Sequence, residues 1–250
     1  TILLKDDDEN IVARTHLLYD GLSIQEAPTK GELTQQIRYA NESDASTTIT
    51  QSYNYYANGN LKQTTNAKGA TTQYIYDPTK TFIIEEINSL DHITYRTLDT
   101  STGNVVRSKD PNGFIITYEY DEFGRITKEV QPYDSVSQPT TAYQYDQDGT
   151  APSIIQVQRR EQSGTDNTFD TLSILDGFGN VIQEKSESTT DKFITKDYLL
   201  DSSQRLSKQS NPYYSDVGFT QADTSIPATS FSYDTPGRRI ETKLPDGSKQ

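Results

Sequence analysis

The chain has 250 residues, and its 36 acidic and 23 basic residues give a net charge of −13. This balance excludes the basic stripe that a nucleic-acid-binding surface needs, so we expect no DNA or RNA partner. Cysteine is absent, which excludes disulfides and Cys-ligated zinc, and no apolar run approaches the ~20 residues of a membrane helix.

The composition predicts an ordered but thin structure. Only 32% of residues are hydrophobic, which is poor for a compact core, yet the chain carries 17 Tyr and 8 Phe, which favour a half-buried sheet surface. The start, TILLKDDDEN, is not a signal peptide, and the chain lacks any Met. We therefore expect a piece of a longer protein.

Residues 1–50 contain three short runs that predict strands, at Ile2–Leu4, Ile11–Ala13 and Ile37–Tyr39. They match the later pattern poorly, so we expect an irregular β segment that leads into the sheet. Residues 51–250 are predicted to form one continuous repeat domain.

A six-residue phrase, Tyr-Asp-x-x-Gly-Arg, occurs at Tyr120–Arg125 and again at Tyr233–Arg238. Asp at the first turn position caps nearby amides, and Gly at the fourth accepts a positive φ, so the phrase predicts a hairpin turn. Related turns lack one or more of its residues. The predicted turn residues are Asp121, Gly124, Arg125, Asp176, Gly179, Asp201, Asp234, Gly237 and Arg238.

Tyrosines precede these turns at alternating positions, which places each pair on one face of a strand. The pairs are Tyr53 with Tyr55, Tyr118 with Tyr120, and Tyr143 with Tyr145. They have two interpretations: cross-strand packing, or a platform that faces a sugar or an extended polypeptide.

A second turn follows about eight residues later, often at a proline such as Pro111 or Pro245. Each unit is therefore strand, turn, strand, turn. Insertions at 131–142, 159–170 and 211–229 are rich in polar residues and are predicted to be surface loops. The fold class that follows is all-β: an elongated, curved antiparallel sheet of repeated β-hairpins, with little helix.

The Tyr-Asp-x-x-Gly-Arg phrases, together with Leu175–Val181 and the loop at Asn211–Tyr214, resemble the YD repeat of Rhs proteins. The repeat also occurs in Tc-toxin B and C components and in teneurins, and the likeness spans roughly residues 15 to 250. Departures include Tyr56 in place of Asp and Gln204 in place of Gly.

The resemblance implies an open fragment of a β-shell that, in bacterial members, encloses a toxic C-terminal polypeptide. It implies a secreted, non-enzymatic virulence protein without cofactors, whose partners are the remainder of the shell and the enclosed toxin. The alternative is a carbohydrate-binding or cell-surface adhesion module that uses the Tyr-rich face.

Candidate catalytic and metal sites are weak. His16 and His92 are the only histidines, and neither has a partner at metal-ligand spacing. Asp6–Glu9 and Asp146–Gly149 are acidic, but neither continues as a calcium-binding loop. Asp110–Gly113 echoes the start of the self-cleaving segment of bacterial shells but lacks its later glycines, so we interpret it as a turn.

Overall fold

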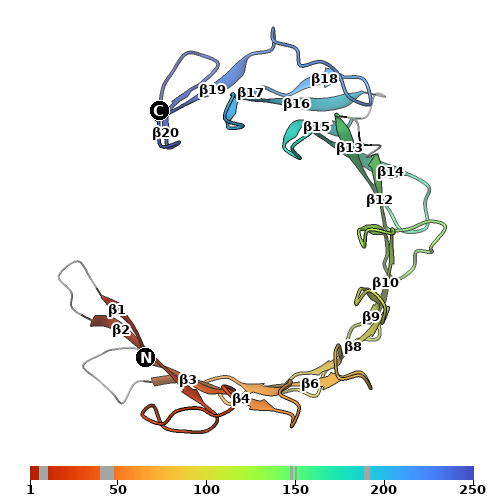
Figure 1. Ribbon diagram of the computed structural model, residues 1–250. Coiled ribbons are helices and arrows are strands. Elements are labelled where there is room, and N and C mark those ends of the chain that lie inside the picture. The colour runs from red at the N-terminus through yellow and green to blue at the C-terminus, as the bar shows by residue number, and fades with distance from the viewer. Residues whose placement is uncertain (6–10, 40–47, 147–148, 150, 189–191) are drawn as a thin grey trace. The chain divides into compact units, whose positions relative to one another are not determined.

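The computed structural model describes residues 1–5, 11–39, 48–146, 149, 151–188 and 192–250. These residues form 20 β-strands and no helix. The chain divides into two compact units, residues 1–116 and 117–250. Figure 1 shows the strands of each unit following one another in chain order. Among the described residues there is no helix that could cross a membrane.

The first unit is a series of antiparallel hairpins in which each strand pairs with the next. Its strands are β1 (Ile2–Lys5), β2 (Ile11–Tyr19), β3 (Leu33–Tyr39), β4 (Thr48–Tyr55), β5 (Leu61–Thr65), β6 (Thr71–Tyr76), β7 (Ile83–Ile87), β8 (Ile93–Leu98) and β9 (Val105–Lys109). The next strand, β10 (Ile115–Tyr120), contains the boundary between the units.

The second unit continues in the same manner from β10 to β17. Its further strands are β11 (Ile126–Val130), β12 (Thr141–Asp146), β13 (Ser153–Arg160), β14 (Thr168–Leu175), β15 (Val181–Glu187), β16 (Phe193–Leu200), β17 (Leu206–Ser210), β18 (Tyr213–Ser215), β19 (Ala228–Tyr233) and β20 (Arg239–Lys243).

The predicted fold class is confirmed, because the described residues form an all-β antiparallel sheet of consecutive hairpins. The three strands expected in residues 1–50 fall within β1, β2 and β3. The division into a leading segment, 1–50, and a repeat domain, 51–250, stays a prediction.

Hydrophobic burial is sparse, as the composition predicts. Only Val130, Leu172, Ile174 and Phe193 are buried hydrophobic residues in the part of the chain that the structure describes. Three of them, Leu172, Ile174 and Phe193, pack together on β14 and β16, with Ile154 and Ile182 against them. The other hairpins must therefore gain much of their order from hydrogen bonds and partly buried side chains.

The insertion at 211–229 is more than the surface loop that the sequence predicts. Its β18 pairs with the first half of β16, while β17 pairs with the second half. The insertion thus adds a short strand to the sheet, and residues after it cover part of the face of β15 and β16, as the contacts of Lys185 below show.

The small core gives a direct test of where hydrophobic packing contributes. Ile174 is fully buried, so Ile174→Ala should lower the free energy of unfolding of the second unit by about 2–4 kcal/mol. Ile240 is 64% exposed, so Ile240→Ala should change it by less than about 0.5 kcal/mol. Denaturant unfolding followed by circular dichroism measures both, and equal effects would contradict this assignment of the core.

Candidate functional site

The turn after β10 shows how the repeated phrase organises a hairpin. Asp121 Oδ1 accepts hydrogen bonds from the backbone N–H groups of Phe123 and Arg125, each at 2.9 Å. Asp121 Oδ2 accepts one from Arg125 Nε at 2.7 Å. Gly124 has φ of +77°, a left-handed conformation that a β-branched residue adopts only with strain. One carboxylate thus fixes both the turn backbone and the arginine that follows it.

Three later turns share the bond in which Oδ1 of the turn aspartate accepts from the N–H four residues later. Asp201 Oδ1 accepts from the N–H of Ser203 at 2.8 Å and from that of Arg205 at 3.0 Å. Bonds from the amide and then the guanidinium of Arg205 hold the pKa of Asp201 below its usual range. Asp176 Oδ1 and Asp234 Oδ1 accept the equivalent bonds from Asn180 N and Arg238 N, at 2.9 and 2.7 Å.

The position expected to need glycine is filled in two ways. Gly179 and Gly237 have φ of +83° and +91°. Gln204, which replaces the glycine of the Tyr-Asp-x-x-Gly-Arg phrase, adopts φ of +60° all the same. The left-handed conformation of this turn position therefore forms at Gln204 as well, without a glycine.

A tyrosine four residues before the positive-φ residue joins each of four hairpins to the preceding one. In every case the hydroxyl donates to the backbone carbonyl of the residue two positions after the last positive-φ residue in the turn of the preceding hairpin. The pairs are Tyr55 to Leu33 at 2.9 Å, Tyr76 to Leu61 at 3.1 Å, Tyr145 to Ile126 at 2.9 Å and Tyr233 to Leu206 at 2.9 Å.

These carbonyls lie where the ladder between two hairpins has stopped. In β11 and β12 the Cα partners begin at Lys128 with Ala142, two residues beyond Ile126. The ladders at Leu33, Leu61 and Leu206 likewise begin two residues later, at Gln35, Gln63 and Lys208. The hydroxyl therefore bonds a carbonyl that the ladder between those hairpins does not reach.

Two of these tyrosines also lie beneath an arginine of the preceding turn. Arg125 Cζ is 4.1 Å from the ring centroid of Tyr145, within the range of a cation–π contact. Arg205 Cζ is 4.7 Å from the ring centroid of Tyr233. The turn aspartate holds the arginine, and the arginine covers the tyrosine of the next hairpin. We call each such set, Asp121–Arg125–Tyr145 and Asp201–Arg205–Tyr233, an Asp–Arg–Tyr clamp.

Sequence reasoning missed two members of these clamps. It considered arginine only directly after glycine, so it passed over Arg205, which follows Gln204. It also left Tyr233 outside the candidate aromatics, although Tyr233 has the same spacing to its turn as Tyr55 and Tyr145. Its fixed position, four residues before the turn glycine, was the signal that could have found it.

Arg238, which was predicted as a turn residue, has only half of the clamp geometry. Its Nε donates to Asp234 Oδ2 at 2.7 Å, but its side chain is 80% exposed. The side chain of Arg125, which makes the same bond to Asp121, is 31% exposed. The two arginines thus form a natural pair for comparison.

The six candidate aromatics, Tyr53, Tyr55, Tyr118, Tyr120, Tyr143 and Tyr145, are all half-buried. The hydroxyls of Tyr55 and Tyr145 are engaged by backbone carbonyls. Burial raises the pKa of Tyr118 and Tyr120. Half-burial is compatible with both interpretations, so cross-strand packing and a ligand-facing role both stay predictions.

The remaining sequence candidates do not assemble into a metal site. No group of three His, Asp or Glu side chains is arranged to hold a metal within the described ranges. Residues 6–9 and 147–148 lie outside those ranges. His16 packs edge-on against Tyr39, with ring centroids 5.1 Å apart. Asp110 Oδ1 accepts from Phe114 N at 2.8 Å, so Asp110–Gly113 forms a turn.

A buried polar cluster on β15, β16 and β18 was not expected from the sequence. Lys185 is 1% exposed, and its Nζ donates to Ser215 Oγ at 2.7 Å, to the Asp216 carbonyl at 2.7 Å and to Thr220 Oγ1 at 3.2 Å. A serine hydroxyl beside a buried lysine can act as a nucleophile, with the lysine amine as its base. Here each of the three N–H groups of the ammonium donates to an acceptor. We therefore interpret Lys185 as a structural residue that holds the insertion to β15 by hydrogen bonds.

Neighbouring polar groups add further hydrogen bonds between the sheet and the insertion. Gln183 Nε2 donates to Asp197 Oδ1 at 2.6 Å and to the Thr220 carbonyl at 3.0 Å. Tyr213 donates its hydroxyl to Asp197 Oδ2 at 2.8 Å. Burial, followed by this bond to Asp197, raises the pKa of Tyr213 to about 12. The insertion is thus held to the sheet by hydrogen bonds.

Comparisons with protein families and solved structures identify proteins that are similar to this chain. The family model of the RHS Repeat matches residues 100–136. The crystal structure of TcdB2-TccC3 is similar, with a TM-score of 0.78 and 11% identity over 97% of this chain and 17% of that one. A structure of the Photorhabdus luminescens Tc holotoxin pore matches 93% of this chain and 15% of that one, with 14% identity and a TM-score of 0.40. No curated protein sequence matches the chain.

The chain is therefore a repeat-built antiparallel β protein with the fold of part of TcdB2-TccC3. It carries an RHS repeat, and the resemblance to the Rhs and YD-repeat family is confirmed. The chain spans 17% of the length of the TcdB2-TccC3 chain that it matches.

Substitutions in the first clamp turn test its structural role. Gly124→Val should lower the free energy of unfolding by about 1–3 kcal/mol, because a β-branched residue at positive φ is strained. Asp121→Asn should be milder than Asp121→Ala, because an amide oxygen can still accept the two backbone bonds. Melting temperatures measure all three, and a neutral Gly124→Val would refute the turn assignment.

The two arginines give a matched comparison. Sequence alone predicts that Arg125→Ala is the mildest change in its turn. The stacking on Tyr145 changes this expectation: Arg125→Ala should cost about 1–2 kcal/mol, through the lost charge-assisted bond and ring contact. Arg238→Ala should cost less than about 0.5 kcal/mol, because an exposed ion pair contributes little. Equal losses in denaturant unfolding would show that the stacking adds nothing.

Proposed function

We propose that the chain is a structural, non-enzymatic segment of a YD-repeat β-shell that encloses a toxic C-terminal polypeptide in a secreted bacterial Rhs or Tc-like toxin. The observation that carries the proposal is the likeness to TcdB2-TccC3, which extends over 97% of the chain. The RHS repeat at 100–136 supports it. The partners are then the remainder of the shell and the enclosed polypeptide.

The local chemistry suits containment. Successive hairpins are joined by hydrogen bonds and by half-buried tyrosines, and few hydrophobic side chains are buried. A continuous sheet of this kind would exclude proteases from the polypeptide that it encloses. The same economy of hydrophobic residues lets one hairpin follow another without a thick core.

The predicted organisation fits this role. Residues 1–50 would lead into the repeats, and residues 51–250 would form one continuous stretch of shell wall. The described strands of both stretches pair antiparallel with their neighbours, which supports this arrangement.

We do not propose the carbohydrate-binding or adhesion alternative. Tyr55 and Tyr145, two of its candidate ligand-facing residues, already use their hydroxyls to bond backbone carbonyls. A catalytic role for Lys185 and Ser215 is not proposed either, since the ammonium is fully engaged.

Limited proteolysis of the longer gene product that contains these residues tests the proposal. Its C-terminal polypeptide should resist trypsin in the native protein and be digested once the shell is unfolded. Gly124→Val should shorten the protection, whereas Tyr143→Phe should leave it unchanged. A C-terminal polypeptide digested equally fast in the native and unfolded protein, or a gene without one, would overturn the proposal.

A further inference from the structure

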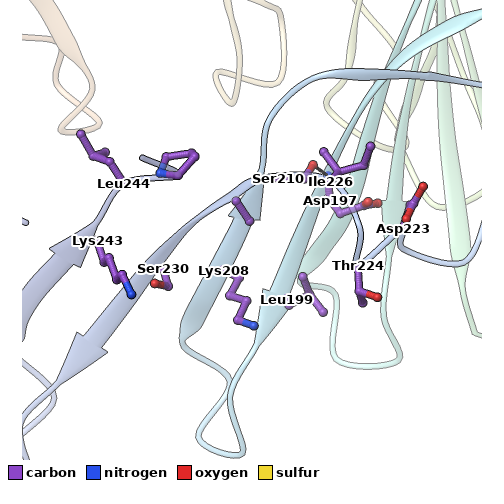
Figure 2. Close-up of a pocket in the computed structure, with 12 residues that line it drawn as sticks. Asp197, Leu199, Lys208, Ser210, Asp223, Thr224, Ile226, Ser230, Lys243 and Leu244 are labelled. Carbon is purple, nitrogen blue, oxygen red and sulfur yellow. Dashed lines mark hydrogen bonds between the residues drawn. The ribbon is translucent and has the colours of Figure 1, made fainter. Parts of the chain in front are cut away.

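The second unit contains a cavity of about 340 Å³ that has no part in the proposed enclosing role. Figure 2 shows its lining side chains on β16, β17, β19 and the end of β20, with the segment of Asp223, Thr224 and Ile226 beside them. The volume is at the lower end of the range for small-molecule sites, about 300–1,000 Å³.

The cavity floor is a regular piece of sheet face. Leu199 is the Cα partner of Lys208, Lys208 that of Ser230, and Ser230 that of Lys243. These residues form one cross-strand row, so their side chains share a face, with neighbouring strands about 4.8 Å apart. The serine hydroxyl therefore lies between two lysines in the row, as Figure 2 shows.

The side chains of Lys208 and Lys243 are both exposed on this face of the sheet. Within the residues that the structure describes, neither Lys208 nor Lys243 has an ion pair or a side-chain hydrogen bond. The carboxylates of the same cavity are already engaged. Asp197 accepts bonds from Gln183 and Tyr213, and Asp223 accepts two from Ser225. These donors are neutral and leave both carboxylates charged, but they occupy acceptor positions of the carboxylates, whereas the ammonium groups of Lys208 and Lys243 have no acceptor among the described residues.

We propose that this cavity binds a small phosphorylated ligand. Its phosphate lies over Ser230, bonded by the serine hydroxyl and by the ammonium groups of Lys208 and Lys243, since lysine binds phosphate as a point charge. The rest of the ligand faces Ser210, Thr224 and the carboxylate of Asp223, so it carries hydrogen-bond donors such as hydroxyl groups.

Calorimetric titration of the 250-residue chain with inorganic phosphate and with glycerol 2-phosphate tests this site. Both should bind, and glycerol 2-phosphate should bind more tightly, because its hydroxyls can reach the other polar groups of the cavity. Lys208→Gln and Lys243→Gln keep most of the side-chain volume and remove the charge. Each should weaken binding about tenfold, the effect expected for one charge-assisted hydrogen bond.

Lys249→Gln is the matched control, because Lys249 is paired with Glu241 at 3.0 Å and does not line the cavity. It should leave binding unchanged, and all three variants should keep the melting temperature of the native chain. The site is refuted if neither probe binds at millimolar concentration. It is equally refuted if the cavity variants bind as the native chain does, or if Lys249→Gln weakens binding as much as they do.

Discussion

The structure depends on a hydrogen bond from a tyrosine hydroxyl to a backbone carbonyl at the point where two neighbouring hairpins stop pairing. Within a hairpin, the two strands bond each other's backbone groups. The carbonyl at the start of the second strand faces the next hairpin, at a position where the pairing between the two hairpins has not yet begun. The tyrosine closes that gap four times in the described residues, each time with the same offsets. Its ring covers the sheet while its hydroxyl joins one repeat to the next.

The other recurrent contacts support this bond. The turn aspartate fixes the hairpin end, and at two turns it also orients the arginine that covers the next tyrosine. Because each contact joins only adjacent hairpins, stability should approximate a sum of hairpin terms and nearest-neighbour terms, as in other repeat proteins. The acceptors of the four tyrosine hydroxyls are backbone carbonyls, so these bonds depend on the tyrosine and on the backbone position but not on the side chain of the acceptor residue.

Sequence reasoning predicted the strands and turns well because their causes are local. Aspartate, glycine and the period-two aromatics act within a few residues, so their spacing is visible in one chain. The acceptors of the tyrosine hydroxyls were not predictable in this way, since a backbone carbonyl leaves no mark in the sequence. Nor was the cluster around Lys185, which forms only when the insertion returns to the face of β15 and β16. A buried lysine looks like a surface residue until the chain that covers it is known.

Two tyrosines on one strand test the central claim most directly. Tyr145 and Tyr143 both lie half-buried on β12, but only Tyr145 donates its hydroxyl to a carbonyl of the preceding hairpin, Ile126. Denaturant unfolding of Tyr145→Phe and Tyr143→Phe removes one oxygen from each. We predict a loss of about 1 kcal/mol in the free energy of unfolding for Tyr145→Phe and almost none for Tyr143→Phe. Equal losses, or none for Tyr145→Phe, would contradict the account.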